Sequence, residues 1–491
     1  MQPKITLLSD QIINRVLDEA FQLLVKPGIK VRNEEARSLL SEAGAHVNKG
    51  SEVVNIPETL VRTSLETVPP EFYLYDLHGN PVVAYSGDKV HFDPGSSGVT
   101  VLDPATLEHK AAETADLIRL IMVAEQLDQL DAQSTAVVCN EVPKEIQDLY
   151  RLFIVLTYSR KPIVTGAFTS KTVGSMIEML SILSGSSKGL REMPRAVFDV
   201  CPNPPLIWSD FGCKGLITLA HAGVPVEIVS MPLAGAAAPV TILGTVTQHA
   251  AECLAGIAIH QLAQPGAPIV WGGAPAIFDM RKGNAPMGAI ETAMIDSSYA
   301  QVGKSLNLPT HAYLGATDSK LVDAQAGLES GINALIGALS GINMISGSGM
   351  LDFLVCQSAE KLVLDAEGIA MARRFMDGVK VLTEPLATGF FERFDFKGDF
   401  LKQKITRELF SKEQYLPTAV IDRNSAGGWK DAGSLDTFSR AKIRVNELIK
   451  SYRRPEMDLN LIEALESMVT NLARKAGMDK LPVDLTFPET M

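Results

Sequence analysis

Residues 225–272 read PVEIVSMPLAGAAAPVTILGTVTQHAAECLAGIAIHQLAQPGAPIVWG, and this stretch decides the fold. A short apolar run, Pro225–Val229, precedes a helix-length apolar segment, Thr247–Leu262, which leads to a second short run, Pro268–Gly272. Strand, helix and strand in this order form the unit from which parallel sheets are built. The stretch therefore predicts an α/β protein with a parallel sheet.

The same unit repeats on both sides of this stretch, over residues 89–375. The expected strands are Lys89–Phe92, Leu130–Val137, Pro162–Ala167, Ala196–Val200, Pro225–Val229, Pro268–Gly272, Thr310–Leu314 and Asn343–Ser346. Strands of this number, with helices between them, close a (β/α)8 barrel, also called a TIM barrel. The alternative, an open doubly wound sheet, predicts a GxGxxG turn after the first strand, and the sequence has none there.

Two further regions flank the predicted barrel. Residues 1–88 are expected to form an N-terminal extension of helices followed by a hairpin around His78-Gly79-Asn80. Residues 376–491 are expected to form a C-terminal extension with helices near Lys402–Phe410, Ser434–Arg453 and Leu459–Ala476. We expect this extension to wrap the barrel or to make contacts in a homo-oligomer.

Charge and composition exclude several classes of function. The formal net charge is -12 and the isoelectric point is about 5.3, so the surface repels nucleic acid phosphates and anionic lipids. The first residues lack the basic start and small-residue cleavage site of a secretory signal. The five cysteines are scattered and odd in number, which argues against a disulfide framework. We therefore expect a soluble cytoplasmic protein.

Aromatic side chains gather where the predicted strands end, which is where a barrel of this kind places its active site. Aromatic residues make up 6% of the chain, so several of them near one barrel mouth are notable. Their faces together could form a cage for a cation that has no N–H to donate. The alternative, packing between barrel and helices, stays open for each one. The candidates are Phe92, Phe168, Trp208, Trp271, Phe278, Tyr313 and Phe353.

The predicted strand ends are also rich in small residues. Small side chains leave room for a bulky group at the barrel mouth, and glycine permits unusual backbone angles. The alternative is loop flexibility. The candidates are Gly95, Ser96, Gly235, Gly272, Gly273, Gly347 and Gly349.

Other barrel chemistries have weaker signals. Cys139, Cys201 and His311 could meet only if the inferred strand positions are right, and no CxxC, CxC or HExxH motif supports a metal site. We therefore predict no metal. Lys320 could form a Schiff base as in barrel aldolases, but it lies several residues beyond its strand. His249 and His260 lie inside a predicted helix and are expected to be structural.

Several stretches together resemble the trimethylamine methyltransferase family, and they span most of the chain. The resemblance implies a (β/α)8 barrel and methyl transfer to the Co(I) of a cognate corrinoid protein docked over the barrel mouth. The partner supplies the cobalamin, so no tightly bound cofactor is expected, and the glycine-rich loops would face the corrinoid. The matching stretches are residues 231–272, 278–291, 317–351, 358–375 and 415–434.

One departure from the family bears on the substrate. Members that act on trimethylamine carry pyrrolysine in the barrel, whereas this sequence contains only the standard amino acids. It resembles the non-pyrrolysine branch, which demethylates quaternary amines such as glycine betaine, proline betaine, carnitine and γ-butyrobetaine. A quaternary nitrogen leaves as a neutral amine and needs no proton, so positioning and desolvation suffice. Glycine betaine, giving dimethylglycine, is the expected substrate.

A betaine also carries a carboxylate, for which the sequence offers Arg281, Lys320, Asn203 and the backbone N–H groups of the glycine-rich loops. Arg281 could equally pair with Asp279 or Glu291, and Asp318 or Glu392 could contact the cation. The alternatives are another betaine as substrate, a different barrel enzyme such as a Schiff-base lyase or aldolase, and a non-catalytic betaine-binding module.

Overall fold

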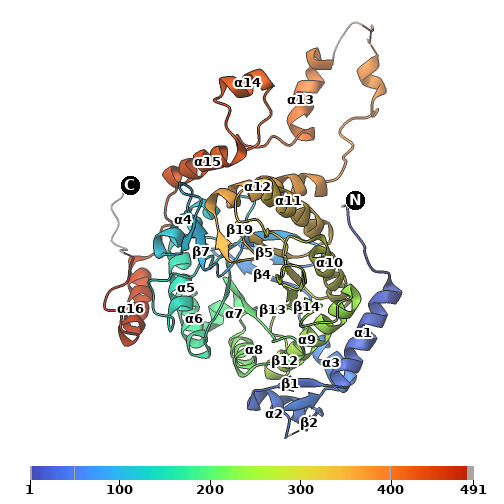
Figure 1. Cartoon of the computed structure of the whole chain (residues 1–491), viewed down its shortest axis with the longest axis vertical. Coiled ribbons are helices and arrows are strands. Elements are labelled where there is room, and N and C mark those ends of the chain that lie inside the picture. Colours follow the sequence, from blue (N-terminus) through green and yellow to red (C-terminus); the bar gives the residue numbers. More distant parts are fainter. Residues whose placement is uncertain (1–2, 49, 393, 395, 397–399, 484–491) are drawn as a thin grey trace.

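The computed structural model describes residues 3–483 except 49, 393, 395 and 397–399. Within this part of the chain, eight parallel strands form one sheet in the order β6-β18-β17-β15-β13-β11-β10-β9. Between the end strands, the Asp131 N–H donates to the Phe92 carbonyl at 2.8 Å and the Ser97 N–H to the Thr135 carbonyl at 3.1 Å. The sheet therefore nearly closes on itself, and the predicted barrel is confirmed (Figure 1). The barrel strands are β6 His91–Pro94, β9 Gln133–Ser134, β10 Ile163–Gly166, β11 Ala196–Val200, β13 Val226–Ser230, β15 Ile269–Gly273, β17 Thr310–Tyr313 and β18 Met344–Ser348.

Helices surround the strands. Side-chain oxygens of Ser209, Thr241, Asp323 and Ser358 accept backbone N–H bonds at the starts of α8, α9, α11 and α12, which explains where these helices begin. Two short strand pairs hold the loops between strands and helices in place. They are β14 Leu233–Ala234 with β16 Ala276–Ile277, and β19 Met350–Leu351 with β20 Cys356–Gln357. The helices are α4 Thr114–Glu125, α5 Gln147–Tyr158, α6 Ser170–Leu183, α7 Ser187–Glu192, α8 Asp210–Ala222, α9 Ile242–Ala263, α10 Ile290–Ser305, α11 Ala324–Leu339 and α12 Ala359–Met376.

Helix α9 is apolar around most of its surface because protein covers most of it. It is long and apolar enough to cross a membrane, but 83% of its most apolar window is buried inside the structure. The N-terminal helices α1 Asp10–Val25 and α3 Glu58–Glu66 pack on its outer face (Figure 1). It is therefore a core helix of the barrel.

The N-terminal extension adds a small sheet and a hairpin. Strands β1 Ile29–Val31, β2 His46–Asn48 and β3 Val53–Asn55 join β12 Ile207–Trp208 in a four-stranded sheet beside α2 Glu34–Glu42. The hairpin of β4 Phe72–Tyr75 and β5 Pro81–Tyr85 occurs where it was predicted. Its side chains join inward-facing barrel residues in one apolar cluster, which closes the N-terminal end of the barrel: Leu74, Val83, Tyr85, Ala132, Val164, Val197, Val270 and Met344.

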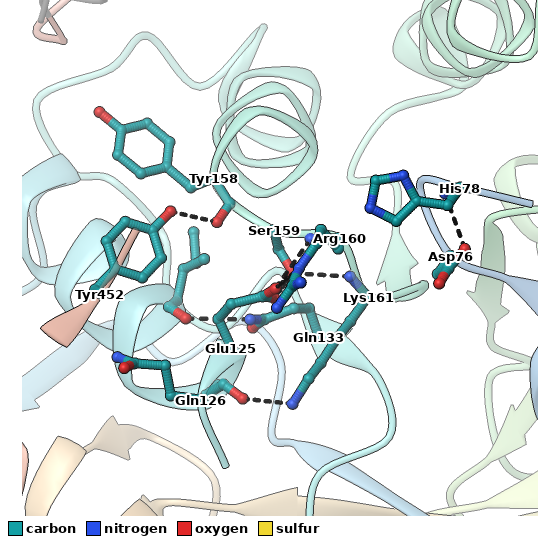
Figure 2. Close-up of polar contacts among 12 residues, drawn as sticks. Asp76, His78, Glu125, Gln126, Gln133, Tyr158, Ser159, Arg160, Lys161 and Tyr452 are labelled. Carbon is teal, nitrogen blue, oxygen red and sulfur yellow. Dashed lines mark hydrogen bonds and ion pairs between the residues drawn. The ribbon is translucent and has the colours of Figure 1, made fainter. Parts of the chain in front are cut away.

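The C-terminal extension has two parts. Helices α15 Thr437–Ser451 and α16 Leu459–Lys475 pack on the barrel helices, whereas α13 Lys404–Glu413 and α14 Ala426–Asp431 project from it (Figure 1). Tyr452 Oη donates to the Tyr158 carbonyl at 2.6 Å and joins the extension to α5 (Figure 2). The antiparallel strand pair β7 Thr100–Leu102 and β8 His109–Ala111 lies in the loop after β6 and joins β19 and β20 in a four-stranded sheet.

Candidate active site

Three carboxyl side chains face the interior of the barrel above the hairpin: Asp93 on β6, Asp199 on β11 and Glu227 on β13. Asp199 and Glu227 are direct partners in the ladder between adjacent strands. Tyr85, from the hairpin below, donates to Glu227 Oε1 at 2.5 Å. The three carboxyl groups therefore form one layer inside the barrel.

Neutral polar groups surround this layer. Tyr313 Oη donates to Asp199 Oδ2 at 3.1 Å, and Ser346 Oγ donates to Asp93 Oδ1 at 2.5 Å. His311 Nε2 lies 3.0 Å from the same Ser346 hydroxyl. Among the described residues, Asp93 Oδ2 and His311 Nδ1 are buried without a hydrogen-bond partner, whereas Glu227 Oε2 lies 3.8 Å from His311 Nε2 and the Asp199 and Glu227 carboxyl groups interact with each other. Such atoms are rare in proteins, so the layer is suited to hold a ligand.

Only one of these carboxyl groups is charged at neutral pH. Burial raises the pKa of Glu227 well above its ordinary value, and the nearby Asp199 raises it further. Burial likewise raises the pKa of Asp93 far above its usual range. The pKa of Asp199 rises only to about 6, because hydrogen bonds with Glu227 and Tyr313 counteract its burial. Burial also lowers the pKa of His311 to about 3, so the layer holds no positive charge. Asp199 and Glu227 share one negative charge, and the Tyr313 hydrogen bond favours this charge on Asp199.

An apolar wall lies on the C-terminal side of the carboxyl layer. It consists of Val229, Ala274, Ala276, Met287, Tyr313, Ala316 and Met350, with Cys201, Leu233 and Leu354 packed against them. Asp199 and Cys201 keep some accessible surface, whereas Asp93 and Glu227 are fully buried. One buried anion beneath an apolar wall suits a cation with apolar substituents.

Several of the predicted aromatic residues do lie at this end of the barrel. Tyr313 contributes to both the apolar wall and the Asp199 contact. Phe168 follows β10 and is 41% exposed, and Phe278 follows β16 close to Gly235. Phe353 makes a cation–π contact with Lys320, whose Nζ lies 4.0 Å from the ring centre. These residues come from different loops of the same barrel end.

The prediction that Phe92, Trp208 and Trp271 line the mouth is wrong. Trp208 and Trp271 are fully buried, and their indole N–H groups donate to the carbonyls of Glu252 on α9 and Tyr299 on α10. Phe92 is also fully buried and faces away from the barrel interior. Side chains alternate along a strand, so Phe92 points outward because its neighbour Asp93 points inward. Packing between barrel and helices, the alternative for these residues, is what the structure shows.

The residues predicted to bind a substrate carboxylate are exposed or are engaged by other groups of the protein. Arg281 is exposed and holds Asp279 through two bonds of 3.0 and 2.7 Å, the alternative given above. Lys320 Nζ donates to the Asp318 carbonyl at 2.8 Å and pairs with Asp352 at 3.5 Å. Asn203 is exposed after β11.

The two predicted cation contacts have other roles. Oδ1 of Asp318 accepts the backbone N–H groups of Met287 and Gly288 at 2.7 and 3.1 Å, which ties two loops together. Glu392 is exposed next to Thr388–Phe391, in the projecting part of the C-terminal extension.

Most of the candidate glycines have local structural reasons. Gly272 and Gly273 are buried within β15, where an added Cβ would lie 2.8 Å from the Ile228 carbonyl oxygen and 2.7 Å from His249 Nε2, respectively. An added Cβ at Gly95 would lie 2.1 Å from Met350. Gly347 and Gly349 are buried with φ of 111° and 84°, where other residues are strained. Exposed Gly235 and half-buried Ser96 remain as residues of the barrel rim.

Other chemistries lack the residues they need at this site. The barrel strands, all of which the structure describes, contain no lysine, so none of them supplies a Schiff-base lysine to the interior. Within the described residues, no group of three His, Cys, Asp or Glu side chains is arranged to hold a metal ion. His249 and His260 are fully buried in α9, as expected of structural residues.

Sequence reasoning did not select the residues of the carboxyl layer and its hairpin partner: Tyr85, Asp93, Asp199 and Glu227. The signal for the carboxylates was present, since AVFDV and VEIVS each place one acidic residue inside an apolar strand. An ionisable side chain rarely lies in such a strand without a specific role.

Comparison with known proteins identifies the family of this chain. Residues 1–478 match the trimethylamine methyltransferase (MTTB) family. The chain is 32% identical over 461 residues to a trimethylamine methyltransferase of Methanosarcina mazei, covering 91% of each protein. It is 27% identical over 478 residues to a glycine betaine methyltransferase of Desulfitobacterium hafniense, covering 97% of this chain and 98% of that protein.

The fold has a counterpart among solved structures. The crystal structure of the Methanosarcina barkeri monomethylamine methyltransferase aligns with a TM-score of 0.55, over 97% of this chain and 89% of that one. At 11% sequence identity this likeness concerns the fold alone. The family match over nearly the whole chain concerns the activity as well: the protein belongs to the trimethylamine methyltransferase family and is a methyltransferase.

Proposed function

We propose that this enzyme moves a methyl group from a quaternary amine to the Co(I) of a corrinoid carried by a separate protein. The observation that carries the proposal is the carboxyl layer inside the barrel, in which Asp199 accepts the Tyr313 hydrogen bond at 3.1 Å beneath an apolar wall. A quaternary ammonium group matches such a site, because its charge attracts Asp199 while its methyl groups pack against apolar side chains.

The reaction needs no proton transfer by the enzyme. Co(I) supplies an electron pair to the methyl carbon, the C–N bond breaks, and its electron pair stays on nitrogen. The products are methyl-Co(III) and a neutral tertiary amine. The residues of this chain bind and orient the amine and exclude water. A site with one negative charge binds the cationic substrate less strongly than a site with three would. Because very tight binding of the substrate slows its conversion to the uncharged product, a single charge suits the reaction.

Glycine betaine, giving dimethylglycine, is the proposed substrate. The absence of pyrrolysine from the sequence and the similarity to a glycine betaine methyltransferase favour it. Proline betaine, carnitine and γ-butyrobetaine have the same reacting group and are the alternatives. Tyr313, Phe168, Phe278 and Phe353 are the proposed aromatic contacts.

The corrinoid protein is proposed to dock at the C-terminal end of the barrel, where Gly235 and Ser96 form part of the rim. The corrinoid then belongs to the partner and no cofactor stays on this chain. The projecting part of the C-terminal extension is a further proposed contact region, for a second copy of the chain. The acidic, soluble character of the chain favours a cytoplasmic location.

Anaerobic spectroscopy tests the proposal. Purified protein is mixed with cob(I)alamin and, separately, with glycine betaine, proline betaine, carnitine and trimethylamine. Methylcob(III)alamin should form with glycine betaine and not with trimethylamine. Formation with another betaine would keep the reaction and change the substrate. No methyl transfer with any of them, with a cognate corrinoid protein also present, would overturn the proposal and leave a betaine-binding module as the alternative.

A further inference from the structure

A buried arginine lies at the same end of the barrel and was not among the predicted ligands. Arg151 belongs to α5 and is fully buried. Its Nη1 donates to Ser97 Oγ at 3.0 Å and to the Thr135 carbonyl at 2.8 Å, and its guanidinium lies 4.4 Å from the Phe168 ring centre. These residues follow β6, β9 and β10, so the guanidinium lies at the C-terminal ends of three barrel strands.

One edge of this guanidinium is unoccupied. Among the described residues, Nε and Nη2 of Arg151 have no hydrogen-bond partner, although both are buried. Their two N–H groups lie on the same side of the planar group and point in parallel. A pair of parallel N–H donors matches the two oxygens of a carboxylate.

The protein itself supplies no carboxylate to this edge. No ion pair joins Arg151 to an acidic residue within the described part of the chain. Neighbouring Asp148 is engaged elsewhere, since its Oδ2 accepts the Phe168 N–H at 2.7 Å and the Thr172 hydroxyl at 2.5 Å. Asp148 is near enough to stabilise the Arg151 charge, but burying the two unbonded N–H groups is costly, and a bound carboxylate would accept both.

Arg151 is also charged and close to the cation site. Burial lowers its pKa to about 10, so the guanidinium remains protonated at neutral pH. Tyr313 is near enough to affect the Arg151 charge, and the same phenol bonds to Asp199. The Asp199 carboxylate and the Arg151 guanidinium therefore both lie near Tyr313.

We infer that the free Nε and Nη2 edge of Arg151 binds the carboxylate of a zwitterionic substrate whose quaternary ammonium group lies by Asp199. The inference rests on the proposed function and narrows it to amines that carry a carboxylate a short distance from the nitrogen. It replaces Arg281, Lys320 and Asn203 as the carboxylate ligand. Phe168, stacked on the guanidinium, covers the ion pair from solvent.

Calorimetric binding without cobalamin tests the inference with three probes: glycine betaine, its methyl ester and tetramethylammonium. The wild-type protein should bind the zwitterion about tenfold or more tightly than the ester, as expected for charged hydrogen bonds. Arg151→Met should lose this preference and bind the ester and tetramethylammonium as the wild type does. Equal binding of zwitterion and ester by the wild type, or an unchanged preference in Arg151→Met, would overturn the inference.

Arg195→Met is the matched control. Arg195 is also buried with unpartnered Nε and Nη1 atoms, but it precedes β11 at the opposite end of the barrel. Its variant should keep the preference for the zwitterion. If Arg151→Met does not fold, the inference is tested by the preference of the wild type for the zwitterion over the ester and by Arg151→Lys. This variant should lose most of the preference, since Lys cannot form the paired contact.

Methyl transfer to cob(I)alamin separates the two proposals. Zwitterion binding that depends on Arg151, without methyl transfer, would sustain the inference and overturn the proposed function. Methyl transfer from glycine betaine and tetramethylammonium that is equally efficient in wild type and Arg151→Met would sustain the proposed function and overturn the inference. Failure of the wild type to bind glycine betaine, proline betaine or carnitine would overturn the inference as well.

Discussion

The phenol of Tyr313 donates a hydrogen bond of 3.1 Å to Oδ2 of Asp199, and this contact joins the apolar wall of the barrel to its one charged carboxylate. The hydrogen bond favours the ionised form of Asp199, which burial alone would disfavour. Tyr313 thereby helps to keep the interior negative at neutral pH.

Removing this phenol should change how the site responds to pH. In Tyr313→Phe the pKa of Asp199 should rise, because its ionised form loses a donor, and KM for the quaternary amine should increase mainly below neutral pH. The expected loss is about 1 kcal/mol of binding free energy. KM measured between pH 5 and 8 tests this. Tyr415→Phe, which removes a 2.7 Å bond to Glu367 far from the barrel interior, should show no such change.

Asp199 and Glu227 should behave differently although they are partners on adjacent strands. Asp199→Asn removes the one negative charge and should weaken tetramethylammonium binding roughly 10- to 100-fold. Glu227→Gln should weaken binding much less, because Glu227 is already neutral at pH 7. Calorimetry on both variants provides the comparison. Equal losses would contradict the assignment of the charge to Asp199.

Cation binding should depend on pH with a definite sign. The pKa of Asp199 in the free protein is about 6, so a proton competes with the cation below that pH. Kd for tetramethylammonium should rise by about tenfold for each pH unit below 6 and stay nearly constant between pH 7 and 8. Arg151 does not titrate in this window, since its pKa is about 10. A Kd independent of pH from 5 to 8 would contradict the assignment.

Lys161 should matter for stability and not for binding. Its Nζ donates to the carbonyls of Ala124, Leu127 and Leu130 at 2.7 to 2.9 Å, at and just beyond the C-terminal end of α4. Figure 2 shows the Lys161 side chain extended toward Gln126 at this helix end. Lys161→Met leaves these carbonyls without a partner and should lower the free energy of unfolding by about 3 kcal/mol. Urea unfolding measures this loss, with exposed Lys188→Met as the control, which should lose almost nothing. KM should be unchanged in both variants.

Much of the fold could be predicted because its determinants are local. Every predicted barrel strand overlaps an observed one, and the hairpin occurs at the predicted residues. Apolar runs, helix-length segments and turn residues repeat at intervals that the backbone itself imposes. The family resemblance could also be recognised from the sequence, since its stretches extend over most of the chain.

Few of the residues predicted for the site coincide with those of the carboxyl layer and the apolar wall. Tyr313, Phe168 and Phe278 lie where they were expected, whereas Trp208 and Trp271 face the surrounding helices. The predicted ligands did not include the ionisable residues of the candidate site, which are Asp199, Glu227 and Arg151.

The order and type of the elements, and with them the barrel, follow from the sequence alone. Which face of each strand points inward follows only from the folded structure. In a closed barrel wrapped by helices both faces of a strand are buried, so hydrophobicity does not distinguish interior from exterior. That choice depends on strand register and closure, which place Asp199 inside and Trp271 outside, and which bring Arg151 from α5 to the ends of three strands.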